Sequence, residues 1–65
     1  MGSLQQVSVQ RADGVTFTGY AWSLSDGTYE CFWDENGVRH NFYFNDKGEQ
    51  IKVAVKRYKI KFNPL

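Results

Sequence analysis

The chain has 65 residues, 42% of them hydrophobic and 17% aromatic, and its formal net charge at neutral pH is +1. This composition is that of a globular protein and excludes a disordered chain, and the length suits one small domain, which we expect over residues 1–65. The single cysteine, Cys31, excludes an intramolecular disulfide, and one cysteine with one histidine does not complete a four-ligand zinc site. We therefore expect no metal and no other cofactor.

The first residues carry no recognisable targeting signal. Residues 1–10 lack the charged start and apolar core of a signal peptide, and no apolar run approaches the roughly 20 residues that cross a bilayer. Together with the lone cysteine, this favours a cytoplasmic location and no membrane partner. Residues 1–4 stand outside the prediction, as a disordered start or a remnant of cloning.

Turn signals at nearly even spacing divide the chain into five strand-like segments. The segments are rich in β-branched and aromatic residues and cover about residues 5–11, 15–25, 28–34, 38–45 and 49–62. The turn signals are Asp13-Gly14, Asp26-Gly27, Asn36-Gly37 and Asp46-Lys47-Gly48. The first three favour type I′ hairpin turns, because glycine and asparagine tolerate positive φ, and the fourth favours a three-residue turn with a left-handed glycine. Hairpins in series predict an all-β fold, a five-stranded antiparallel meander.

In the second and fifth segments the apolar alternation changes phase midway. The fifth slips by one position near Lys56 and Arg57. The second slips near Gly19, which keeps three aromatic side chains on one apolar face: Phe17, Tyr20 and Trp22. A one-residue slip turns side chains to the other face unless a bulge absorbs it, and a glycine inside a strand often marks such a bulge. We therefore expect two bent strands and a meander curled into a small open barrel of the SH3-like or OB-like kind.

The aromatic residues are too many for so small a core. In the third segment Tyr29, Cys31 and Trp33 alternate onto one face and leave Phe32 on the other. In the fourth segment Tyr43 lies opposite its apolar neighbours. We therefore expect Phe32 and Tyr43 to be exposed rings. Such rings stack on single-stranded bases, and they also form hot spots of protein interfaces or a dimer seam.

Few residues are candidates for catalysis. His40 falls on the apolar face of its segment, where we expect a partly buried side chain. The alternative is a general acid or base beside Glu30, as in small ribonucleases, but no second catalytic group is evident. The carboxylates at or beside turns suit local backbone hydrogen bonds: Asp13, Asp26, Asp34, Glu35 and Asp46. We therefore expect no enzymatic activity.

Charge is unevenly divided along the chain. Residues 1–38 hold five carboxylates and one arginine, whereas residues 39–65 hold seven basic and two acidic side chains. In the last segment Arg57, Lys59 and Lys61 alternate onto one face, about 6.6–6.8 Å apart by the rise of a strand, on the scale of backbone phosphate spacing. The alternative interpretation is that lysines on a terminal strand guard its edge against aggregation.

These features favour a non-catalytic binding module. We expect a nucleic acid as the partner, bound by six residues: Arg57, Lys59, Lys61, Lys56, Tyr43 and Phe32. The nearly neutral net charge weighs against this hypothesis, because nucleic-acid modules are usually basic. The alternative is a small protein–protein interaction module, an inhibitor or adaptor that uses its aromatic face or an edge strand. A homodimer is one form that such an interaction takes.

Overall fold

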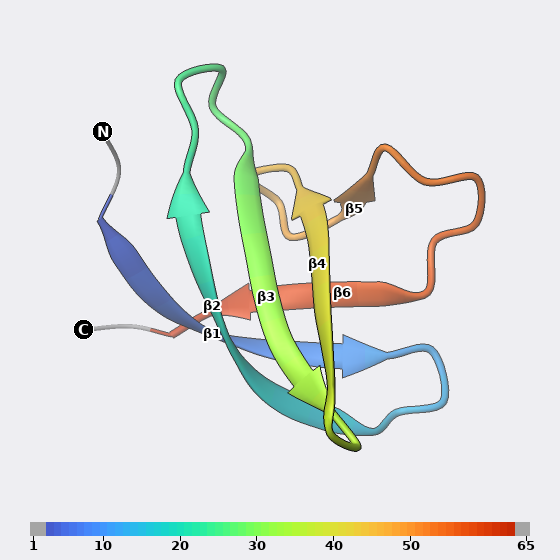
Figure 1. The fold of residues 1–65 in the computed structure, drawn as a ribbon. Helices are drawn as coiled ribbons and strands as arrows, with labels where there is room; N and C mark the ends of the chain where they lie inside the picture. The colour runs from blue at the N-terminus through green and yellow to red at the C-terminus, as the bar shows by residue number, and fades with distance from the viewer. Residues whose placement is uncertain (1–2, 64–65) are drawn as a thin grey trace.

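The computed structural model describes residues 3–63, and within this range the chain folds into six β-strands and no helix (Figure 1). The strands are β1 (Leu4–Arg11), β2 (Thr16–Ser23), β3 (Tyr29–Glu35), β4 (Val38–Phe44), β5 (Gln50–Ile51) and β6 (Tyr58–Phe62). All neighbouring strands are antiparallel, in the sheet order β5-β4-β3-β2-β1-β6, and the sheet curls into a nearly closed barrel. The prediction of an all-β, antiparallel small barrel is confirmed.

The N-terminal segment joins the sheet earlier than expected. Leu4 is the first residue of β1 and pairs with Trp22 of β2. The expectation of a disordered start is therefore wrong at this residue, and residues 1–2 lie outside the described residues.

The β2 strand turns the sheet over onto itself. It pairs with β1 from Thr16 to Trp22 but with β3 only from Tyr20 onward. Figure 1 shows β2 bending strongly, so that β1 and β6 cross β3 and β4 at a steep angle as a second layer. The barrel closes on its far side, where Glu49 pairs with Lys59 and the Ile60 N–H donates to the carbonyl of Gly48 over 3.0 Å.

The predicted turns form, but their geometry differs from the expectation. Only the turn at Asn36-Gly37 has positive φ at both residues, 53° and 82°, as a type I′ turn requires. In the turns that contain Asp13 and Asp26 only the following glycine is left-handed. Each of these two carboxylates instead accepts a hydrogen bond from the backbone N–H two residues ahead. The type I′ prediction is therefore confirmed at one turn and wrong at two.

The last predicted strand is in fact two strands separated by a loop. After β5, Lys52 adopts a left-handed conformation with φ of 62°, and residues 52–57 run as a loop until β6 begins at Tyr58. The change of phase near Lys56 and Arg57 marks this loop, so the prediction of one bent strand is wrong. Alternation alone does not distinguish a bulge from a short loop, because both shift the phase of the pattern.

Gly19 is a point of close packing and not a bulge. The register between β1 and β2 runs without interruption, so Gly19 and Ala21 face the core while Tyr20 and Trp22 face outward. A Cβ at Gly19 would lie 2.9 Å from the carbonyl oxygen of Phe32. The predicted slip is therefore wrong, because the glycine is required by the approach of β3 and not by an irregular backbone.

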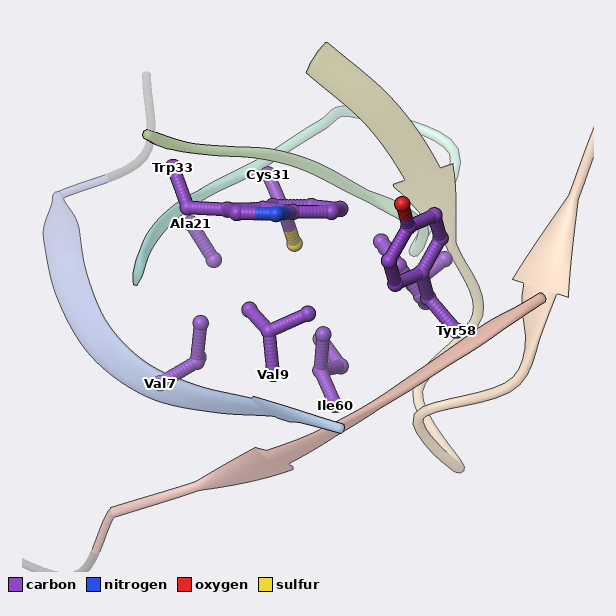
Figure 2. Close-up of a cluster of buried hydrophobic side chains, with 8 residues drawn as sticks. Val7, Val9, Ala21, Cys31, Trp33, Tyr58 and Ile60 are labelled. Carbon is purple, nitrogen blue, oxygen red and sulfur yellow. The ribbon is translucent and has the colours of Figure 1, made fainter. Parts of the chain in front are cut away.

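Side chains from both layers fill the barrel. The buried hydrophobic core consists of Val7, Val9, Ala21, Cys31, Trp33, Phe44, Tyr58 and Ile60. Figure 2 shows the indole of Trp33 lying across this core with the ring of Tyr58 at its side, and the two ring centroids are 4.9 Å apart. Cys31 is fully buried, and its side chain enters the core from the same face of β3 as the side chain of Trp33. The prediction that Cys31 and Trp33 share one face of the third segment is confirmed.

Candidate functional site

The outward side chains of β6, β1 and β2 form one continuous surface, the outer face. Ser8 of β1 lies opposite Thr18 of β2 on one side and opposite Lys61 of β6 on the other. The members of this face, all exposed, are Leu4, Gln6, Ser8, Gln10, Thr16, Thr18, Tyr20, Trp22, Lys59 and Lys61. No aspartate or glutamate lies among these residues. Within the described part of the three strands, the outer face therefore carries only cationic, neutral polar and hydrophobic groups.

Four cations gather at the β6 side of the outer face. Lys59 and Lys61 point outward from β6, whereas Lys56 and Arg57 belong to the preceding loop. None of the four forms an ion pair with any residue in the range 3–63. The prediction of one row of three cations in a strand is therefore wrong for Arg57. None of the four side chains is held in an ion pair, although Lys56 and Lys59 lie near enough to Glu49 to lower the pKa of its carboxyl.

A pocket lies where β6, the β1–β2 turn and the loop 52–57 meet. Its volume is about 300 Å³. The lining residues that carry charge or amide groups include Gln10, Glu49, Gln50, Lys56, Arg57 and Lys59. A second hollow is lined by Ser8, Gln10, Thr16, Lys59, Ile60 and Lys61. Because Gln10 and Lys59 line both, the pocket and the hollow are neighbours along β1 and β6, and we refer to the two together as the groove.

Gln50 holds the loop against the barrel beside this pocket. Its side chain is 2% exposed, and its Oε1 accepts hydrogen bonds from the backbone N–H of Arg57 at 2.9 Å and of Tyr58 at 3.1 Å. A buried amide that satisfies two backbone donors is costly to remove. The position of Arg57 and the start of β6 therefore depend on a residue that the sequence pattern did not single out.

The exposed aromatic rings are Tyr20 and Trp22, each 40% exposed on the outer face. Phe32 and Tyr43 point outward as predicted but are half-buried, because the guanidinium of Arg39 lies 5.3 Å from the ring centre of Phe32 and the ammonium of Lys52 lies 4.6 Å from that of Tyr43. The sequence reasoning missed the two most exposed rings because it assumed a slip. Regular alternation through Gly19 would have found them.

The structure brings together only part of the predicted site. Lys56, Arg57 and Lys59 share the pocket, and Lys61 continues the groove. Phe32 lies on β3, where its ring centre is 5.9 Å from that of Tyr20, and so adjoins the outer face. Tyr43 lies on β4 opposite Ile51 and lines neither hollow. Five of the six predicted residues therefore lie on or beside one surface, and Tyr43 does not.

A polar cluster surrounds Glu35, the last residue of β3. The carboxylate is 12% exposed and pairs with Arg11 at 2.7 Å, while its other oxygen accepts hydrogen bonds from the Tyr58 hydroxyl at 3.1 Å and the Trp33 indole at 3.3 Å. Burial opposes ionisation of Glu35, yet these donors outweigh it and hold its pKa below the usual range. Arg11 also binds Asp13 at 2.7 Å. Arg11 is therefore occupied within the protein, although it lines the pocket.

The pairing of His40 with Glu30 considered from the sequence is wrong. His40 faces inward, where its ring stacks 5.8 Å from that of Trp33, whereas Glu30 faces outward and accepts a hydrogen bond from Asn41. The carboxylate near His40 Nε2 is that of Glu35, at 3.9 Å. Burial also raises the pKa of the Cys31 thiol to about 12, which disfavours the reactive thiolate.

Neither a metal centre nor a membrane-spanning helix is found in the described part of the chain. Within 3–63 no three histidine, cysteine, aspartate or glutamate side chains lie close enough together to hold a metal ion. The same range contains no helix long and apolar enough to span a membrane.

In comparisons with known proteins, no family model, no curated protein and no solved structure matches the chain.

Proposed function

We propose that this protein is a non-catalytic module that binds single-stranded nucleic acid along the outer face of β6, β1 and β2. The observation that carries the proposal is the absence of carboxylates from a surface that, in its described part, joins unpaired cations to exposed aromatic rings. Phosphates are attracted to cations and repelled by carboxylates, and bases stack on aromatic rings. A polar surface with cations and rings but no anion suits both halves of a nucleotide.

The dimensions of the outer face suit a few nucleotides. Lys61, Ser8 and Thr18 lie side by side on neighbouring strands, so the first and third are about 10 Å apart. Tyr20 lies two residues beyond Thr18 on the same face, about 7 Å further along β2. A single strand of two or three nucleotides spans this distance, so one ligand can touch Lys61 and Tyr20 together.

The middle of the outer face supplies hydrogen bonds without charge. Serine, threonine and glutamine side chains separate the cations from the rings: Gln6, Ser8, Gln10, Thr16 and Thr18. Hydroxyl and amide groups both donate and accept, so they bind sugar hydroxyls, phosphates or base edges of either hydrogen-bond polarity. This neutral strip favours binding that tolerates many sequences.

The decisive experiment replaces Arg57, Lys59 and Lys61 together by Gln and measures binding of DNA and RNA single strands of about 12 nucleotides at salt concentrations of about 50 and 200 mM. The wild type should lose affinity steeply with salt. The triple variant should bind more weakly, and its salt slope should fall by about 0.7 for each phosphate that it no longer neutralises. Lys52→Gln is the matched control, because the Lys52 ammonium lies over the ring of Tyr43 and the residue lines neither the pocket nor the second hollow.

Two results would contradict the proposal. If the triple variant binds single strands as the wild type does but aggregates more readily, the cations guard the edge of β6. If Trp22→Ala abolishes binding of a protein partner whose affinity does not depend on salt, the outer face is a protein interface. The observation that favours this second function is that Leu4, 47% exposed, pairs with the exposed Trp22.

A further inference from the structure

The pocket beside the loop 52–57 is lined by a buried side chain, that of Gln50, whose amide nitrogen finds no acceptor among the described residues. The Oε1 of Gln50 accepts two backbone hydrogen bonds, which fixes the orientation of the amide and turns Nε2 away from the loop. Among residues 3–63 this nitrogen donates to no acceptor. Every fully enclosed side-chain nitrogen or oxygen in that range has a hydrogen-bond partner, so Nε2 is not fully enclosed. Nε2 is therefore in contact with solvent, and the pocket that Gln50 lines is where a ligand with an acceptor oxygen would reach it.

The charges around the pocket define the ligand further. Lys56, Arg57 and Lys59 form no ion pair within 3–63, and among the lining residues the one carboxylate is that of Glu49. A hydrogen bond from Asn45 and the nearby lysines hold the pKa of Glu49 below its usual range, so it stays ionised at neutral pH. Arg11 also lines the pocket but is neutralised by Asp13 and Glu35. The remaining three cations and one anion suit a ligand with about two negative charges, which is the charge of a phosphomonoester at neutral pH. An internal phosphodiester carries only one.

The groove along β1 and β6 ends at this pocket. Beyond Gln10 and Lys59, the walls are the β1–β2 turn and the loop 52–57. The N–H of Ala12 in the turn donates to the carbonyl of Arg57 in the loop over 2.8 Å, which ties the two walls together. A nucleic-acid strand that follows the groove meets this wall, so the pocket suits the end of a strand better than its middle.

We propose that the pocket is a phosphomonoester site that holds the phosphorylated end of the bound strand. The inference rests on the proposed function. Nε2 of Gln50 donates to a phosphate oxygen, and Lys56, Arg57 and Lys59 balance its charge. The volume of about 300 Å³ leaves room for the sugar or base of the last nucleotide beside the phosphate.

The test is a competition assay in which unlabelled strands of about 12 nucleotides displace a strand with an internal fluorophore. The competitors carry a 5′-phosphate, a 3′-phosphate, or hydroxyl groups at both ends. One phosphorylated competitor should bind about tenfold more tightly than the hydroxyl strand, the size expected for charge-assisted hydrogen bonds. This preference should shrink as the pH falls below about 6, where the phosphate takes up a proton.

Three variants separate the pocket from the rest of the groove. Gln50→Glu keeps the oxygen that accepts the two backbone hydrogen bonds but replaces the donor nitrogen by an acceptor, so the preference for a phosphorylated end should disappear. Lys56→Gln, on an exposed loop residue that lines only the pocket, should reduce the preference several-fold. Lys61→Gln, in the second hollow only, should weaken all competitors in the same proportion. Circular dichroism spectra check that each variant is folded.

The outcomes distinguish this inference from the proposed function. If all three competitors bind equally well, with an affinity that still depends on salt, the end site is overturned and the binding function stands. The end site is likewise overturned if Lys56→Gln and Lys61→Gln reduce the preference for a phosphorylated end by the same factor. If no single strand binds, both proposals fall together.

Discussion

The closure of the barrel depends on Gly48, and a matched pair of glycines tests this. Gly27 and Gly48 have almost the same backbone conformation, with φ of 87° and 82°. A Cβ at Gly27 would meet no atom within 4 Å, whereas a Cβ at Gly48 would overlap the carbonyl oxygen of Ile60. Alanine at either position therefore adds the same backbone strain, and only the change at Gly48 forces β6 away from the turn before β5.

The expected cost follows from the surroundings of the two glycines. A left-handed alanine costs about 1–2 kcal/mol at either site. At Gly48 the displacement also removes the hydrogen bond from the Ile60 N–H, worth about 1 kcal/mol, and exposes part of the Ile60 side chain, about 1 kcal/mol more. Gly48→Ala should therefore lower the free energy of unfolding by about 2 kcal/mol more than Gly27→Ala. In a domain of this size that difference lowers the melting temperature by roughly 8–16 °C more.

Urea unfolding followed by far-ultraviolet circular dichroism measures both variants against the wild type. The slope of the free energy against urea should stay the same for Gly27→Ala, because the surface that this variant exposes on unfolding does not change. Equal destabilisation by the two substitutions would refute the reasoning, since it would mean that the contact between Gly48 and Ile60 does not hold the barrel closed.

Three further predictions concern single residues. Gly19→Val should lower the free energy of unfolding by about 1–3 kcal/mol, through the collision with the Phe32 carbonyl, and a neutral effect in urea unfolding would contradict that contact. Because the pKa of Glu35 is held below its usual range, the ionised carboxylate stabilises the fold above about pH 5, and this contribution is lost as the pH falls through the lowered pKa. Glu35→Gln should therefore lose less stability than the wild type as the pH is lowered. If the urea midpoint of the variant depends on pH as that of the wild type does, the carboxylate of Glu35 does not supply this stability. Cys31 should react with a thiol reagent only in urea, and fast labelling of the folded protein would show that the core opens.

The all-β class and the faces of the middle strands could be predicted from the sequence because they depend on local chemistry. Turn glycines reverse the chain, and alternating side chains divide a strand into two faces. Trp33 and Cys31 face the core, and Phe32 faces outward, as their positions in the pattern predicted. These features require no knowledge of what lies across the barrel.

The misread position in β2 and the misread start of β6 depend on contacts between different parts of the chain. Gly19 resembles a bulge in the sequence, but it is there because the backbone of β3 comes too close for a Cβ. The loop before β6 is held in place because the buried Gln50 side chain binds two backbone groups, of Arg57 and Tyr58, seven and eight positions further along the chain. Sequence spacing contains no record of such approaches.

The candidate site also has one part that the sequence predicted and one part that it did not. Its cations were found from the sequence, because an excess of lysine and arginine near the C-terminus is visible in the composition. Its exposed rings could have been found by regular alternation through Gly19, but the position of Tyr20 and Trp22 on the same surface as the cations depends on the pairing of β6 with β1 and of β1 with β2. Charge is a property of residues, which the sequence determines by itself. The neighbourhood of a charge is a property of strand order and register, which only the tertiary structure decides.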